Sequence, residues 1–139
     1  MATYKDMGIT DVAFYADVDL TLAQYYHVTV ASTAGYVKVA TGACNPAPLG
    51  VLQNAPSAGQ EARVRLLGLS KVFAVTGSGS ALQSGKYFTV NASGQAVPVA
   101  TDGGSPVSGR WLDTTAPVSA SRYGQAFIWP FATCAISAS

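Results

Sequence analysis

The residues that could carry out a reaction are few and widely spaced. Asp17 and Asp19 stand two apart, so on a strand both carboxylates would face one side, as a general acid–base pair requires. The segment from Asp17 to Thr21 nevertheless fits a solvated strand face that enters a turn better than a catalytic pair. His27 is the single histidine, so no triad or histidine-based metal site can be assembled, and it is expected as a strand residue. The sequence therefore predicts no catalytic residues, no metal site and no cofactor, and it favours a protein that is not an enzyme.

Two short motifs resemble functional signatures but lack the necessary context. Residues 77–80 read GSGS, yet no Lys-Ser or Lys-Thr follows, so a phosphate-binding loop is not indicated. Asn91-Ala92-Ser93 has the form of a glycosylation sequon. We interpret it as a hairpin turn in which Gly94 supplies a positive φ.

Charged residues make up 11 % of the chain and the net charge is +1. An average soluble domain has about a quarter charged residues, so less than half the usual number is present. Such a chain offers no basic patch for nucleic acid and none for an anionic membrane. A low charge suits a surface that lies against other chains, and it equally suits a small extracellular-type β domain with a hydroxyl-rich surface.

The N-terminal sequence MATYKDMGITD lacks the apolar core of a signal peptide, and no run approaches the length of a membrane span. We therefore expect synthesis in the cytosol. Cys44 and Cys134 lie 90 positions apart, and in a reducing compartment two free thiols are expected.

The local pattern is β throughout the chain. Residues 61–66 alternate with a period of two, which is typical of a strand with one buried face. Gly68 interrupts this pattern and predicts a bulge or a sharp bend in a long strand. No stretch of ten residues shows a convincing helical stripe.

The second half of the chain repeats the first. Residues 28–30 (VTV) match 88–90 (FTV), residues 36–41 match 96–101, and Gly50 matches Gly109. A further match aligns Ala58-Gly59-Gln60 with Tyr123-Gly124-Gln125. Two copies are too few for a solenoid, so they are expected to close on each other. The prediction is an all-β fold, a compact β-sandwich or small barrel built from pseudo-repeats at about 25–75 and 86–131, within a single domain at 17–139.

Residues 1–16 precede the repeats and are expected to form an N-terminal arm. A merely solvated terminus would not usually carry so many apolar side chains, so some of them should be buried on this subunit or on a neighbour. The candidate capsid or subunit interface joins apolar residues of the arm to two large aromatic anchors of the second repeat. Its members are Tyr4, Met7, Ile9, Phe14, Tyr15, Trp111 and Trp129.

Several motifs together resemble the small all-β capsid decoration (cement) proteins of tailed bacteriophages. They comprise Asp19-Leu20-Thr21, the run from Leu49 to Pro56, the run from Gly59 to Val64, and Gly109-Arg110. The resemblance covers residues 17 to 131 and consists of turn-and-strand signatures without catalytic content. The sequence departs from the family pattern in the loop at 113–123 and in the aromatic ending at 127–131.

The resemblance implies a structural virion protein on the outer capsid surface, made in the host cytoplasm. Such proteins bind the expanded shell, often as homotrimers, and clamp neighbouring major capsid proteins. A ligand that binds only the expanded lattice stabilises it by mass action. The implied partners are therefore the major capsid protein and further copies of the chain, with no nucleic acid and no membrane.

Two other classes of function remain open at this stage. One is a β-rich binding module of a phage tail or fibre that recognises a carbohydrate or another virion protein. It requires exposed aromatic side chains beside Asp or Asn, and Trp111 with Asp113 is the only candidate pair in the sequence. The other is an enzyme, for which no convergent set of titratable residues is visible.

Overall fold

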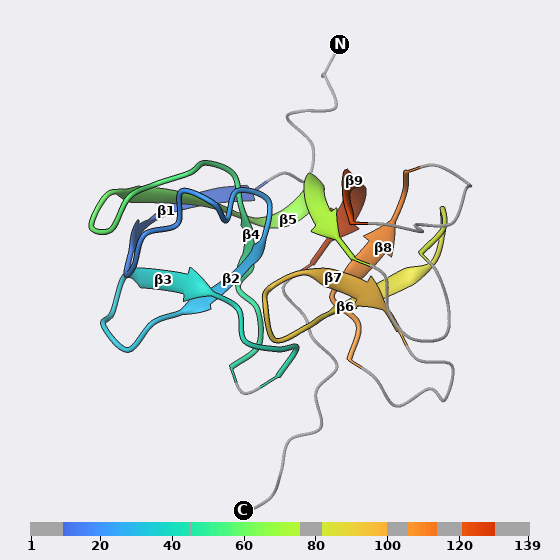
Figure 1. Cartoon of the computed structure of the whole chain (residues 1–139), viewed down its shortest axis with the longest axis horizontal. Coiled ribbons are helices and arrows are strands. Elements are labelled where there is room, and N and C mark those ends of the chain that lie inside the picture. Colours follow the sequence, from blue (N-terminus) through green and yellow to red (C-terminus); the bar gives the residue numbers. More distant parts are fainter. Residues whose placement is uncertain (1–9, 45, 76–81, 100–105, 114–120, 130–139) are drawn as a thin grey trace, which may run out of the picture.

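The computed structural model describes residues 10–44, 46–75, 82–99, 106–113 and 121–129, and these residues form nine strands joined in one sheet (Figure 1). No helix occurs in these segments, so none could cross a membrane. The all-β prediction is confirmed. The strands are β1 (Thr10–Ala16), β2 (His27–Val30), β3 (Tyr36–Val39), β4 (Gly50–Leu52), β5 (Glu61–Ala74), β6 (Tyr87–Val90), β7 (Ala96–Pro98), β8 (Gly109–Trp111) and β9 (Arg122–Ile128).

The sheet closes partly into two rings of strand pairings and is not a single barrel. The first ring runs β1-β3-β2-β4 and returns to β1 through residues 61–67 of β5. The second ring runs from residues 68–74 of β5 through β7, β6, β8 and β9 back to β5. Figure 1 shows the rings side by side, with β5 passing from one to the other. The strand β5 thus ends the first ring and begins the second.

The two rings have the same topology. In each, the first and third strands pair in parallel, and every other pairing is antiparallel. The register of matching strand pairs shows which residues of the two rings correspond. In β2 and β4, His27 pairs with Val51 and Val28 pairs with Gly50. In β6 and β8, Tyr87 pairs with Arg110 and Phe88 pairs with Gly109 in the same way. We call residues equivalent when they hold the same place in matching strand pairs.

The register also corrects two details of the sequence alignment. Gly124 lies within β9 and is equivalent to Ala62 of β5, whereas Gly59 lies in the turn that precedes β5. Strands β3 and β7 align one residue away from the sequence match, since Val37 is equivalent to Ala96. The connection between the paired residues Val30 and Val37 is one residue longer than that between Val90 and Ala96, and this difference produces the shift.

The alternation of β5 follows from its position in both rings. Its even-numbered residues from Ala62 to Ala74 lie on the inner face, and most of them are fully buried. Between Leu67 and Gly68 the strand exchanges its partner β1 for β9, and the pairing with β1 skips Leu66. Gly68 has a φ of 115°, which favours glycine. The irregularity predicted at Gly68 is therefore found as a bulge at Leu66, two residues earlier, together with a change of strand partner at Gly68.

Equivalent residues of different size fill the two cores. Val28 and Leu52 of the first ring correspond to the larger Phe88 and Trp111 of the second, and all four are fully buried. The second ring compensates with smaller residues elsewhere. A Cβ at Gly124 would collide with the Trp111 indole, so glycine at this position makes room for the larger ring.

The expected N-terminal arm is a strand from Thr10 onward. Strand β1 pairs with β5 from Tyr15–Glu61 to Thr10–Leu67 and with β3 at Tyr15–Tyr36. It closes the first ring, a role that the sequence did not reveal because its turn signals begin only after Ala16. Residues 1–9 lie outside the described part of the chain.

The expectation of free thiols is wrong for Cys44, which is disulfide-bonded. The sequence argument depended on the cellular compartment, whereas a disulfide requires two Cα atoms within about 7 Å, a distance that sequence separation does not reveal. Cys134, the other cysteine of the chain, lies outside the described residues.

Candidate interaction surfaces

The rings meet at a seam built from β2 of the first ring and the β6–β7 turn of the second. The backbone N–H of His27 donates to the carbonyl of Gly94 at 2.8 Å. A Cβ at Gly94 would lie 2.6 Å from Val39 Cγ1, so the turn packs directly on the first ring. The Tyr26 and Phe73 rings stack across the seam, with centroids 5.0 Å apart and planes 5° from parallel.

Tyr25 adopts an unusual backbone conformation at the point where the two rings meet. Its φ is 70°, in the left-handed region that side chains other than glycine rarely occupy. Its N–H donates to the carbonyl of Leu52, and its own carbonyl accepts from the N–H of Phe73 in the second ring. The Tyr25 side chain packs against the second core, with the Lys71 Nζ 5.2 Å from the ring centroid. These contacts offset a backbone cost of about 1 kcal/mol.

His27 is 2 % exposed and lies edge-on to Phe88, with ring centroids 5.7 Å apart. Burial lowers the pKa of His27 to about 4, and the nearby backbone carbonyl of Gly94 opposes the shift only in part. Neither ring nitrogen makes a hydrogen bond to a described residue. His27 is therefore a neutral packing residue of the seam, in agreement with its interpretation as a strand residue.

The second ring presents on its outer surface a row of three apolar or aromatic side chains and one arginine. The pairings β5–β9, β9–β8 and β8–β6 place Leu69, Phe127, Arg110 and Tyr87 next to one another in that order. All four side chains are exposed. The Arg110 guanidinium lies 5.9 Å from the centroid of the Tyr87 ring, and the Trp129 ring lies within about 6 Å of both Tyr87 and Phe127. Such a row is a candidate contact surface for another protein.

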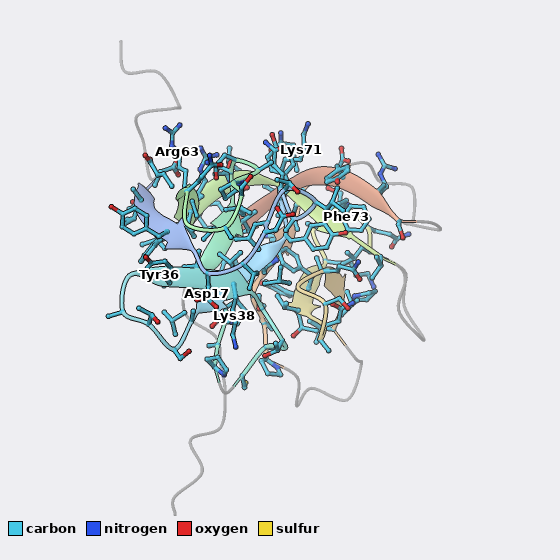
Figure 2. All side chains as sticks on the ribbon, turned by 60° about the vertical axis from the view of Figure 1, so that its left-hand side comes forward. Asp17, Tyr36, Lys38, Arg63, Lys71 and Phe73 are labelled. Carbon is cyan, nitrogen blue, oxygen red and sulfur yellow. The ribbon has the colours of Figure 1, made fainter. Side chains whose placement is uncertain are left out.

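A second aromatic pair lies at the opposite end of the molecule, on the first ring. The rings of Tyr15 and Tyr36 have centroids 5.5 Å apart, and Tyr15 is 54 % exposed. Glu61 pairs with Tyr15 across β1 and β5. Figure 2 shows Asp17, Tyr36 and Lys38 gathered at this end, and Lys71 and Phe73 away from them over β5.

The predicted interface residues fall into three groups. Tyr4, Met7 and Ile9 lie outside the described residues. Phe14 is half-buried against the first core, whereas Tyr15 is exposed. The structure does not bring Phe14 and Tyr15 together with the third group, Trp111 and Trp129. The first two belong to the first ring and the two tryptophans to the second.

Trp111 must be removed from the predicted interface. It is fully buried in the second core, since the alternation of β8 places it on the inner face. Its pairing with Asp113 as a carbohydrate site fails for the same reason, and the Asp113 carboxylate instead accepts a hydrogen bond from Arg122 at 3.2 Å. Trp129 is half-buried, and its indole N–H donates to the Val107 carbonyl at 3.3 Å.

Asp19, one of the two acidic residues considered from the sequence, makes a local hydrogen bond. Asp19 accepts a hydrogen bond from the backbone N–H of Thr21 at 3.1 Å, and this bond lowers the pKa of the exposed carboxyl. That geometry matches the turn expected for this segment. Among the described side chains no group of three or more His, Cys, Asp or Glu gathers as a metal site would require, and these residues enclose no pocket.

Sequence reasoning missed Leu69, Tyr87 and Phe127. Each stands in the outward phase of its strand, next to a buried residue of the inward phase. An apolar residue at an outward position of a strand was a usable signal, because the alternation along each strand shows which residues face outward. For Tyr87 the repeat gives the same phase, since Tyr87 is equivalent to His27.

The fold defines a class of all-β protein in which two equivalent rings of strands share one long strand. A solved structure has this fold: the N base of the head fiber protein gp8.5 of bacteriophage phi29. It aligns with a TM-score of 0.60 at 20 % sequence identity, over 91 % of this chain and 99 % of that one. No family model and no curated protein sequence matches the chain.

Proposed function

We propose that this chain is a structural protein of a phage virion, located on the head, that binds the outer surface of the expanded capsid. The observation that carries the proposal is the shared fold with a phage head fiber base, which extends over nearly the whole of both chains. The role is one of binding rather than catalysis. It is also the role that the resemblance of the sequence to capsid decoration proteins implies.

The surface chemistry supports a protein that is covered by partners in its working state. The chain has a low charge and exposes aromatic side chains on both rings, among them Tyr15, Tyr87 and Phe127. Aromatic residues are enriched at protein interfaces, and charged residues are depleted in interface cores. In this proposal the protein clamps neighbouring major capsid proteins, and preferential binding to the expanded lattice stabilises that lattice.

We further propose that the protein acts as a homotrimer and that the segment before β1 contacts the shell. Tyr4, Met7 and Ile9 of this segment are apolar, and burying two or three such side chains contributes roughly 1.5–3 kcal/mol each before ordering costs. Three such segments acting together raise the apparent affinity well beyond that of one.

The test is co-sedimentation of the purified protein with expanded heads of the phage that encodes it, followed by electron microscopy of the particles. Unexpanded proheads of the same phage are the control. We expect saturable binding to expanded heads, density at repeated lattice positions, and weak binding to proheads. Absence of binding to expanded heads would overturn the proposal.

A further inference from the structure

The seam within one chain is a head-to-tail contact between two unlike faces. The first ring contributes Tyr26, His27 and Val51, and the second ring contributes Phe73 and Gly94. Val51 is an outward residue of β4 that packs into the core of the second ring. Because the rings are equivalent in topology, each ring also carries the face that the other ring uses at the seam. These two remaining faces lie at the two ends of the molecule.

The free face of the second ring consists of Lys86, Tyr87 and Arg110, the equivalents of Tyr26, His27 and Val51. His27 is 2 % exposed beneath the second ring, whereas Tyr87 is 51 % exposed. The turns that lead into β2 and β6 also match, since Gly85 donates to the Trp111 carbonyl as Tyr25 donates to that of Leu52, both at 2.7 Å. Gly85 and Tyr25 share a positive φ, of 88° and 70°.

The free face of the first ring consists of Tyr15, Val30, Gly35 and Glu61. These residues are equivalent to Phe73, Val90, Gly94 and Tyr123 of the second ring. Val90 is 4 % exposed and Val30 is 51 % exposed. A Cβ at Gly94 would collide with the first ring, whereas one at Gly35 would meet nothing within 4 Å. In Figure 1 the β6–β7 turn points against the first ring, and the equivalent β2–β3 turn points the same way into open space.

The substitutions that distinguish the free faces from the seam are complementary in charge. Tyr26 stacks on Phe73 at the seam, and the equivalent residues at the free faces are Lys86 and Tyr15. Tyr123 lies beside Tyr25 at the seam, with ring centroids 5.9 Å apart, and its equivalent is Glu61. The Arg110 side chain donates to the carbonyl of Gly85, the equivalent of Tyr25. A second copy docked as at the seam would therefore place Glu61 beside Gly85 and the Arg110 guanidinium that contacts it, and Lys86 over Tyr15.

We infer that the free face of the second ring binds the free face of the first ring of another copy, with the side chains placed as at the seam within one chain. The seam's backbone hydrogen bond from Phe73 to Tyr25 has no counterpart there, because the Tyr15 N–H donates to the Gly35 carbonyl of its own chain at 2.9 Å. The occupant of each face is a second copy of this chain. The contact is heterologous, so it joins copies head to tail and closes a ring if the rotation between copies allows it. This inference rests on the self-association proposed above and names the surfaces that produce it, and it does not require the capsid.

The test uses pure full-length protein without any shell, in sedimentation velocity, and its failure is therefore distinct from failure of the capsid role. Tyr15→Lys disables the free face of the first ring, and Tyr87→Lys disables that of the second. Wild-type protein should assemble, and each variant alone should be a monomer, with the dissociation constant raised about 30-fold or more, as for a central interface aromatic. An equimolar mixture of the two variants should form a dimer and nothing larger, because one intact face remains on each. Leu22→Lys, at a 91 % exposed side chain on neither face, should assemble as the wild type does.

Only a heterologous contact predicts two monomeric variants whose mixture forms a dimer. If the contact used the same face on both partners, the variant that keeps this face intact would assemble by itself. Monomeric wild-type protein at about 100 μM, or a mixture that yields no dimer, would overturn the inference. The charge reversals Glu61→Lys and Arg110→Glu provide an independent test at exposed side chains, should a lysine variant fail to fold. Each reversal alone should weaken assembly, and the double variant should restore it. Equal weakening in the double variant would contradict the pairing.

Discussion

Among the described glycines, Gly50 of β4 is the one whose added Cβ would come nearest to a backbone atom of a neighbouring strand. A Cβ built on Gly50 would collide with the carbonyl oxygen of Arg65 and lie 2.9 Å from its carbonyl carbon. The backbone conformation of Gly50 is not of the kind reserved for glycine, so steric crowding is the only penalty. The variant Gly50→Ala therefore measures how tightly β4 and β5 are held together.

The magnitude follows from the atoms that must move. Arg65 belongs to the ladder between β4 and β5, so its carbonyl cannot retreat without disturbing the pair Val51–Arg65. Overpacking costs about 1–3 kcal/mol, and each weakened ladder hydrogen bond costs about 1 kcal/mol. We expect Gly50→Ala to lower the free energy of unfolding by about 2–4 kcal/mol, which corresponds to roughly 6–12 °C in Tm for a chain of this length.

The assay is guanidinium unfolding followed by circular dichroism and by tryptophan emission. Gly109→Ala is the matched variant in the second ring, where a Cβ would lie 2.6 Å from the carbonyl oxygen of Phe127, the equivalent of Arg65. Gly59→Ala is the control: its φ of 82° carries a backbone cost of about 1 kcal/mol, but a Cβ there meets nothing within 4 Å. If Gly50→Ala loses no more stability than Gly59→Ala, the reasoning from close backbone contact is refuted.

Three further predictions follow from the seam and from β1. His27 is neutral in the folded protein and gains a proton in the unfolded chain below pH 6.5. Its contribution to stability is therefore complete above pH 6.5 and is lost as the pH falls toward 4, by at most about 1.4 kcal/mol per pH unit. The variant His27→Leu should flatten the dependence of stability on pH between pH 6.5 and 5, and an unchanged slope would contradict this. Tyr25→Gly should be more stable than Tyr25→Ala by about 1 kcal/mol in thermal unfolding, because only glycine relieves the positive φ; the opposite order would show that the turn relaxes. Deletion of residues 2–9 should leave Tm nearly unchanged while it weakens binding to expanded heads. Deletion of residues 2–16 should abolish the cooperative unfolding transition, because it removes β1. Equal Tm values for the two truncations would be evidence against the role of β1 in closing the first ring.

The pattern of residues along the chain was sufficient for the fold class and for the duplication. The alternation at 61–66 predicted a half-buried strand, and Gly68 predicted an irregularity within it, because both depend on local backbone geometry. The match of Gly50 with Gly109 also proved structural, since both glycines face the carbonyl of an equivalent residue in the neighbouring strand. The pairing of β1 with β5 could not be predicted, because it joins residues far apart in the sequence, and the disulfide of Cys44 depends on proximity in three dimensions.

The candidate surfaces show most clearly what the sequence determined and what only the tertiary structure decided. The sequence alone determined that His27 and Tyr87 hold matching places in two repeats, because local pattern sets the phase of a strand. It did not determine that one is buried and the other exposed. The shared strand β5 sets the rings head to tail, so the second ring covers the outer face of the first, and its own equivalent face has no covering ring within the chain. Burial at these positions is a property of the packing between rings, and the same local sequence pattern is compatible with either outcome.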